Sequence, residues 1–225
     1  MSYTDIGGIA GYNNSGTINQ CYNMGSVFDT NIYYDSNSGG IVGYNSGTVS
    51  GCYNNGMIKT TANGARDVNI GGIAGYNNKT INDSRNSGMI SAVLPSTANA
   101  TINIGGVVGY NNSAITDCCN TGTISDASLS TFTYAFAGGI AGSNYKSVSG
   151  CYNTGKVTTY SSASSGRNHA GGIVGYNINS SIRQCYNTGA VSSSYNSYAG
   201  GITGYNVVER GYYSAVIQSC NNIGT

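Results

Sequence analysis

The sequence is built on an internal repeat in which a Gly-Gly-Ile or Gly-Gly-Val step recurs every 29 to 34 residues. The seven steps begin at Gly7, Gly39, Gly71, Gly105, Gly138, Gly171 and Gly200. A period in this range is typical of solenoids, propellers and other repeat architectures, in which each unit contacts mainly its neighbours. We therefore treat residues 1–225 as a single repeat domain of seven units.

Comparing the seven units shows which positions carry the same residue in every unit. Asparagine closes the segment that begins with Gly-Gly, at Asn13, Asn45, Asn77, Asn111, Asn144, Asn177 and Asn206. A second invariant asparagine follows at Asn23, Asn54, Asn86, Asn120, Asn153, Asn187 and Asn222. Glycine is fixed two residues later, at Gly25, Gly56, Gly88, Gly122, Gly155, Gly189 and Gly224. Stacked asparagines can hydrogen-bond to each other and tolerate left-handed backbone, and glycine permits close backbone approach, so we expect these columns at corners.

Three further columns are β-branched. The first is Ile9, Ile41, Ile73, Val107, Ile140, Ile173 and Ile202. The second is Ile18, Val49, Ile81, Ile115, Val148, Ile182 and Ile217. The third, which follows the fixed glycine, is Val27, Ile58, Ile90, Ile124, Val157 and Val191. Short β-branched and aromatic runs between Gly and Asn, without any helical period, predict three short strands in each unit.

These features predict an all-β fold, a parallel β-solenoid (β-helix) of about seven coils, each of about 33 residues with three short strands. In such a stack each strand pairs with its equivalent in the next coil, about 4.8 Å away, which explains why the same residue recurs. The variable stretches are expected to form a looser loop on one side, at Phe28 to Ser38, Ser91 to Ile104 and Ser125 to Ala137. A seven-bladed β-propeller is the alternative, but a blade needs four strands in about 40 to 45 residues.

Six of the seven cysteines share one position of the repeat, where the third unit carries Ser84. They are Cys21, Cys52, Cys118, Cys151, Cys185 and Cys220. Their spacing fits neither a disulfide framework nor the paired Cys-x-x-Cys of a zinc site, and a bond between the adjacent Cys118 and Cys119 would be strained. We expect reduced thiols that face the shared core as small apolar residues.

Residues that could support catalysis are scarce. The only histidine, His169, falls in a variable Ser/Asn/Gly stretch that we expect to be a loop, and the eight acidic residues share no repeat position. We therefore expect no enzyme activity, and no catalytic, cofactor or metal site. The net charge of +1 comes with singly scattered basic residues, which argues against nucleic acid as a partner.

No apolar run approaches the roughly 18 residues of a membrane-spanning helix, so no transmembrane segment is expected. The polar residues after Met1 do not resemble a signal peptide. The chain is therefore expected to be either intracellular or part of a longer exported protein.

Tyrosine forms two columns. One comprises Tyr12, Tyr44, Tyr76, Tyr110, Tyr176 and Tyr205, and is interrupted at Ser143. The other comprises Tyr22, Tyr53, Tyr152 and Tyr186. Such columns either cover the edge of the core with their hydroxyls in water, or form an aromatic track for glycans or an adhesive interface.

The unit from Gly171 to Val191 closely resembles the GLUG motif repeat of bacterial surface proteins, and the resemblance extends over nearly the whole chain. Such repeats occur in putative adhesins and in regions that accompany immunoglobulin A-cleaving metallopeptidases. The resemblance implies an extracellular or cell-surface spacer or adhesive role within a longer exported protein. The family's peptidase zinc motif has no match in this sequence.

Two alternatives to a passive spacer remain open. The last unit stops before its third strand, and residues 1–6 supply the end of such a strand, so one copy could continue the stack of the next. The first alternative is therefore a fibre subunit that assembles head to tail with itself, instead of being capped by flanking domains. The second is a carbohydrate-binding module that uses the tyrosine columns to hold glycans or a host surface.

Overall fold

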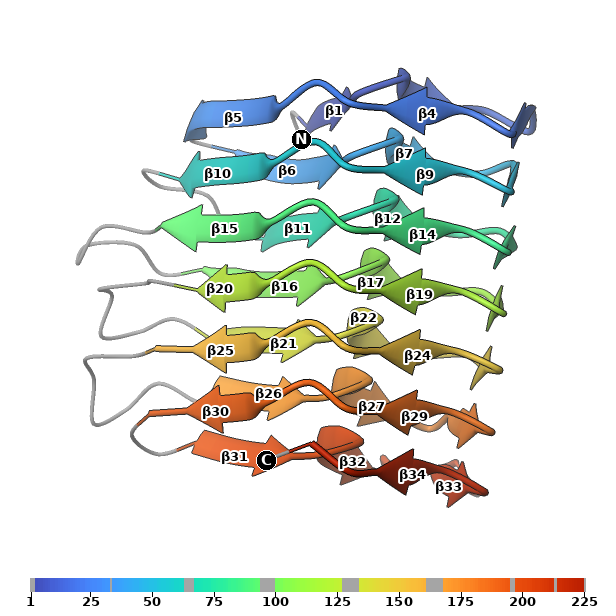
Figure 1. Ribbon diagram of the computed structural model, residues 1–225, viewed down its shortest axis with the longest axis vertical. Coiled ribbons are helices and arrows are strands. Elements are labelled where there is room, and N and C mark those ends of the chain that lie inside the picture. Colours follow the sequence, from blue (N-terminus) through green and yellow to red (C-terminus); the bar gives the residue numbers. More distant parts are fainter. Residues whose placement is uncertain are drawn as a thin grey trace.

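The computed structural model describes residues 3–32, 34–62, 67–93, 100–126, 134–160, 168–194, 197–212 and 214–224. Within these ranges the chain contains strands and turns but no helix. Every pairing between the described strands is parallel and joins equivalent positions of consecutive units, as Gly39 pairs with Gly7 and Gly71. Successive coils therefore lie over one another along a single axis (Figure 1), and the predicted β-solenoid is confirmed.

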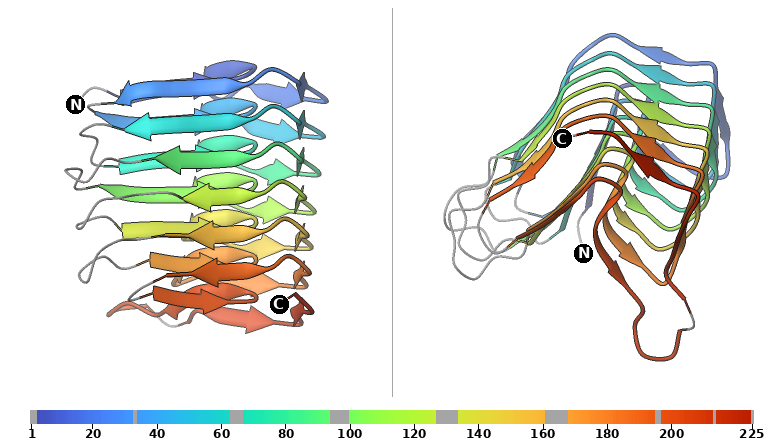
Figure 2. Two further views of the ribbon diagram at one scale, coloured as in Figure 1. Left: turned by 60° about the vertical axis from the view of Figure 1, so that its left-hand side comes forward. Right: turned by 60° about the horizontal axis from the view of Figure 1, so that its bottom comes forward.

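Each complete coil carries five short strands, and the equivalent strands of successive coils form five sheets, which we number after their first strands (Figures 1 and 2). Sheet 1 contains β1 (Tyr3–Gly7), β6 (Asp35–Gly39), β11 (Asp67–Gly71), β16 (Thr101–Gly105), β21 (Tyr134–Gly138), β26 (Asn168–Gly171) and β31 (Ser197–Gly200). Sheet 2 contains β2 (Ala10–Asn13), β7 (Val42–Asn45), β12 (Ala74–Asn77), β17 (Val108–Asn111), β22 (Ala141–Asn144), β27 (Val174–Ile178) and β32 (Thr203–Val207).

The other three sheets have shorter strands. Sheet 3 contains β3 (Thr17–Asn19), β8 (Thr48–Ser50), β13 (Ile81–Asn82), β18 (Ile115–Thr116), β23 (Val148–Ser149), β28 (Ser181–Arg183) and β33 (Val216–Gln218). Sheet 4 contains β4 (Tyr22–Asn23), β9 (Tyr53–Asn54), β14 (Arg85–Asn86), β19 (Cys119–Asn120), β24 (Tyr152–Asn153), β29 (Tyr186–Asn187) and β34 (Asn221–Asn222). Sheet 5 contains β5 (Val27–Ile32), β10 (Ile58–Ala62), β15 (Ile90–Val93), β20 (Ile124–Asp126), β25 (Val157–Thr159) and β30 (Val191–Ser193).

The number of strands per coil is five, and the prediction of three is wrong for two reasons. The second predicted strand is divided between sheets 3 and 4. In addition, the stretches expected to be loops carry regular structure: residues 28–38 contain most of β5 and all but the last residue of β6. The middle of each of the three stretches lies outside the described residues. Because sheet 5 has six strands and the others seven, the stack comprises six complete coils and most of a seventh.

The backbone adopts the left-handed conformation at a different position from the asparagine columns, where it was predicted. None of the fourteen invariant asparagines has a positive φ; instead, the residue immediately before the cysteine position does so in every coil. Its φ lies between 45° and 64° at Gln20, Gly51, Asp83, Asp117, Gly150, Gln184 and Ser219. One left-handed residue reverses the chain between sheets 3 and 4, and this reversal divides the predicted second strand.

The interior holds two apolar cores. The wider core lies between sheets 2, 3 and 4 and contains the first two β-branched columns together with the cysteine column, as at Ile73, Ile81 and Cys118. The narrower core lies between sheets 5 and 1, where Ile90 packs near Ile70 and its neighbours. These side chains are fully buried in the middle coils, and each such burial contributes roughly 1.5 to 3 kcal/mol.

A narrow waist separates the two cores, where the Gly-Gly step passes the asparagines of sheet 4. A Cβ atom on Gly106 would lie 2.4 Å from Cγ of Asn120 and 2.1 Å from the carbonyl oxygen of Gly139. Only a residue without a side chain can occupy this position. The close approach therefore accounts for the second glycine of every Gly-Gly step.

The asparagines at the waist form a continuous ladder. The Asn120 amide donates to Oδ1 of Asn153 at 2.8 Å and to the Gly122 carbonyl at 2.8 Å. Its Oδ1 accepts from Nδ2 of Asn86 at 2.8 Å and from the Gly122 amide at 3.2 Å. The full hydrogen-bonding capacity of a primary amide is thereby used. The same coil-to-coil bond joins all seven asparagines of this column.

The asparagines that end the strands of sheet 2 form a second ladder of the same kind. Six bonds of 2.8 to 2.9 Å connect its seven members, each donating to the next coil. Both ladders lie mostly buried along the stack. The two ladders thus add two side-chain hydrogen bonds to the backbone pairing at every junction between coils.

Candidate functional site

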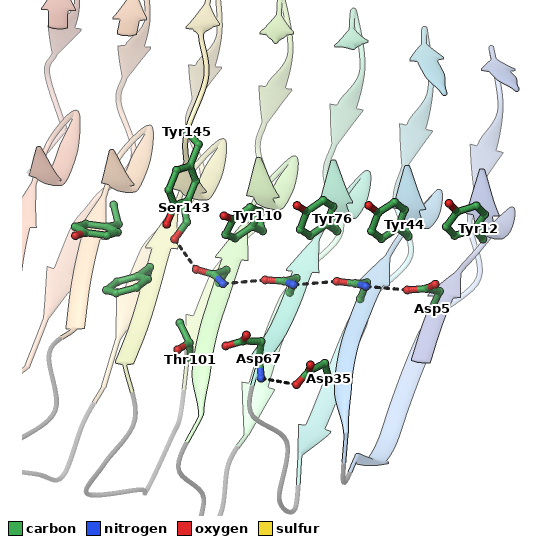
Figure 3. Close-up of a pocket in the computed structure, with 15 residues that line it drawn as sticks. Asp5, Tyr12, Asp35, Tyr44, Asp67, Tyr76, Thr101, Tyr110, Ser143 and Tyr145 are labelled. Carbon is green, nitrogen blue, oxygen red and sulfur yellow. Dashed lines mark hydrogen bonds between the residues drawn. The ribbon is translucent and has the colours of Figure 1, made fainter. Parts of the chain in front are cut away.

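A groove of about 670 Å³ runs along the stack where sheets 1 and 2 meet (Figure 3). The two sheets approach backbone to backbone, because sheet 2 has a glycine at the contact. A Cβ atom on Gly75 would lie 2.5 Å from the Ser38 nitrogen, and one on Gly109 would lie 2.5 Å from the Ile70 nitrogen. The side chains that flank this seam come from several consecutive coils, so the lining of the groove repeats with the coils.

The first wall of the groove is a stack of tyrosine rings from sheet 2. The ring centroids of Tyr12, Tyr44, Tyr76 and Tyr110 are 5.1, 4.7 and 4.9 Å apart, with interplanar angles of 17°, 3° and 9°. Where the column is interrupted at Ser143, Tyr145 places its ring 5.0 Å from that of Tyr110 and continues the stack. The structure therefore brings four of the six predicted tyrosines together and adds one that the alignment of units did not identify.

The floor of the groove is a chain of side-chain hydrogen bonds on sheet 1. Asn103 donates to Asn69 at 2.8 Å, Asn69 donates to Asn37 at 2.9 Å, and Asn37 donates to the Asp5 carboxylate at 2.8 Å. The Ser143 hydroxyl, which is the first donor of this chain, donates to Oδ1 of Asn103 at 2.5 Å (Figure 3). Because all the bonds point the same way and end on a carboxylate, each bond polarises the next.

The third row of lining residues comprises Asp35, Asp67 and Thr101, at the first positions of β6, β11 and β16 (Figure 3). The Asp67 backbone amide donates to the Asp35 carboxylate at 3.1 Å. The expectation that the acidic residues share no repeat position is wrong for this pair, which occupies equivalent places four residues before Gly-Gly. Together with Asp5, the two carboxylates line the groove, and none of its described lining residues is Lys or Arg.

Two phenols at one end of the tyrosine stack are held in their neutral form. Burial raises the pKa of Tyr110 well above its ordinary value, and a hydrogen bond with Tyr145 and the nearby charge of Asp67 add to the rise. Burial likewise raises the pKa of Tyr145. Both hydroxyls therefore stay protonated throughout the physiological pH range.

From the fifth coil onward, aromatic rings replace the polar floor. Phe136, His169 and Tyr198 occupy the sheet 1 position that carries asparagine in the second to fourth coils. Phe136 stacks on Tyr176 at 4.8 Å, and His169 stacks on Tyr205 at 5.0 Å. His169 lies in β26 and is only 4% exposed, so the expectation that it lies in a loop is wrong. Tyr176 and Tyr205 thus belong to an aromatic cluster beyond the tyrosine stack, and its members Phe136 and Tyr176 line the far end of the groove.

The cysteine column lines the wider core between sheets 3 and 4. All seven cysteines are free thiols; Cys21 and Cys220 in the terminal coils are partly exposed, and the other five are buried. Cys119, the seventh, belongs to sheet 4 and lies outside the column. A hydrogen bond with the Cys151 thiol, followed by burial, raises the pKa of Cys185 well above its ordinary value. The pKa of Cys151 is also raised, first by its hydrogen bond with Cys118.

We expect the stability of the fold to decrease as the pH rises above about 8.5, the ordinary pKa of a thiol. In the folded state Cys151 and Cys185 remain protonated, whereas in the unfolded chain they ionise above this pH. The unfolded state then binds fewer protons and is favoured, by up to about 1.4 kcal/mol per thiol for each further pH unit. Urea unfolding midpoints measured between neutral and moderately alkaline pH test this expectation.

The control is Cys151→Ser, because the third coil shows that serine fits this column. The Ser84 hydroxyl donates to the Asn82 carbonyl at 2.9 Å and accepts from the Cys52 amide at 3.2 Å. The variant should lose stability less steeply at alkaline pH than the parent. An unchanged slope would show that the buried thiols do not cause the effect.

Comparison with known proteins was informative for one unit of the repeat. Residues 166–192 match the GLUG motif. The match begins five residues before the Gly-Gly step at Gly171 and ends within β30, and it includes Tyr176, Asn177, Cys185 and Asn187. No curated protein and no solved structure matches the chain. The GLUG motif and the solenoid together fit a structural repeat segment.

The described residues provide little for other chemistry. They contain no group of three or more His, Cys, Asp or Glu side chains placed to hold a metal ion. Across the same ranges, no helix is present that is long and apolar enough to cross a membrane. The groove is therefore the main candidate site that the fold presents.

Proposed function

We propose that this chain is a rod-shaped structural segment of a bacterial surface protein, exported as part of a longer chain and without catalytic activity. The observation that carries the proposal is the continuity of the two asparagine ladders across every junction between coils. A solenoid joined in this way is held together by the same contacts at every junction and can be lengthened by adding coils. These properties suit a spacer that holds neighbouring domains apart.

The proposed surface location rests on the context that the GLUG resemblance implies, and an antibody experiment tests it. Antibodies raised against the purified chain should label intact cells of a bacterium that encodes it. Labelling that appears only after the envelope has been permeabilised would contradict the proposal. An antibody against a cytoplasmic protein of the same cells is the matched control for envelope integrity.

A further inference from the structure

We propose that the groove between sheets 1 and 2 binds a linear polysaccharide that carries no acidic groups. This goes beyond the role of a spacer, because a spacer does not require a ligand, and it does not depend on where the protein resides. The groove extends from the first coil, which contributes Asp5 and Tyr12, to the sixth, which contributes Tyr176. Five coil steps correspond to about 24 Å. A tyrosine wall and a polar floor that recur over four consecutive coils suit a ligand that is itself a repeating chain.

The orientation of the tyrosine rings determines what the first wall can recognise. Tyr44 has a ring stacked on either side, at 5.1 and 4.7 Å, and Tyr76 is enclosed in the same way. Their faces are therefore covered by one another, and only ring edges and hydroxyls remain for the groove. Ring edges carry partial positive charge, so they attract oxygen lone pairs. The wall is thus suited to hydroxyl and ether oxygens and is not a platform for stacking.

The third row of lining residues, which forms the wall opposite the tyrosines, offers groups that complement those of the tyrosine wall. Asp35 and Asp67 are acceptors for hydroxyl hydrogens, and the Thr101 hydroxyl can donate or accept. A chain of hydroxyl groups can thus donate to the carboxylates on one side and accept from phenols on the other. An acidic polysaccharide would meet three carboxylates and no basic side chain among the lining residues, so repulsion excludes it.

A cationic chain, such as a basic peptide, is the competing ligand, because the groove is acidic. Aromatic residues bind cations through the ring face, within about 6 Å of the centroid. In this stack the faces are covered, and the positive edges would repel an ammonium group. Carboxylates on one wall and ring edges on the other favour a ligand with both hydroxyl hydrogens and oxygen lone pairs over a cation.

Titration calorimetry with defined oligosaccharides tests the proposal. The probes are cello-oligosaccharides and N-acetylchito-oligosaccharides, from disaccharides to hexasaccharides, with alginate oligosaccharides and oligolysine for comparison. We expect both neutral series to bind with an affinity that rises with chain length, because longer chains contact more coils. Preference for alginate or for oligolysine, or no binding by either series, would overturn the proposal.

Two conservative variants test whether the oligosaccharide binds in the groove. Tyr44→Phe keeps the stacked ring and removes one hydroxyl, and Asp35→Asn keeps an oxygen that can accept from the Asp67 amide. Each should weaken binding roughly three- to tenfold, the effect of losing one hydrogen bond. The matched control is Tyr186→Phe, whose ring stacks on Tyr152 at 5.0 Å in sheet 4, and it should bind like the parent. Equal affinity for all three variants and the parent would refute the assignment.

Discussion

Replacing Gly106 by alanine is expected to lower the free energy of unfolding by at least about 3 kcal/mol, at the upper end of the range for overpacked positions. The added methyl group would lie 2.1 Å from the Gly139 carbonyl oxygen and 2.4 Å from Cγ of Asn120. Neither neighbour can move easily, since one is the backbone of the next coil and the other is held by four hydrogen bonds. Urea unfolding followed by circular dichroism measures the loss.

Gly25→Ala is the matched control for a glycine in the same type of coil. A Cβ atom at this position would meet only Oδ1 of Asn23, at 3.6 Å, which is an ordinary contact. We expect a change within about 0.5 kcal/mol, because such substitutions also reduce the entropy of the unfolded chain. If Gly106→Ala were as stable as Gly25→Ala, the close approach at the waist could not be the reason for the Gly-Gly step.

The parallel stacking could be predicted because every coil needs the same type of side chain at the same position of the core. The β-branched residues Ile41 and Ile73 recur at equivalent positions, which indicates that like residues lie over one another. This inference does not depend on how long each strand is. The number of strands could not be predicted, because β9 consists only of Tyr53 and Asn54, too short for an alternation of apolar and polar residues to appear. The reversal that separates it from β8 varies in residue type, as Gly51 and Asp83 show.

The groove was predicted on one side only. The tyrosine wall follows the Gly-Gly step at constant distance, so the alignment of units found it. The amide floor precedes that step and is separated from the preceding unit by stretches of variable length, which conceal its repeat. Counting backward from Gly-Gly places Asn37, Asn69 and Asn103 two residues before the step, together with Phe136 and His169 in later coils. This count would also have placed His169 in a strand.

Removing one amide from the middle of the sheet 4 ladder should be as damaging as overpacking the waist. Asn120→Ala breaks four hydrogen bonds and leaves Nδ2 of Asn86 and Oδ1 of Asn153 buried without this partner. Each buried group left unsatisfied costs about 1 to 3 kcal/mol, so we expect a loss of about 3 to 5 kcal/mol. Urea unfolding measures the total. Hydrogen exchange should show the greatest loss of protection in the fourth coil and its two neighbours, because coils contact only adjacent coils.

A second variant and a control separate the hydrogen bonds from side-chain volume. Asn120→Asp keeps the shape and the acceptor oxygens but cannot donate to Asn153 or to the Gly122 carbonyl, so it should be nearly as unstable as Asn120→Ala. Asn55 is exposed and its side chain accepts a hydrogen bond from Ser87 at 2.7 Å, so Asn55→Ala should change stability by about 0.5 kcal/mol or less. If the Asn120→Asp protein were stable, side-chain volume at the waist, and not the directed chain of amide hydrogen bonds, would explain why asparagine occupies this position.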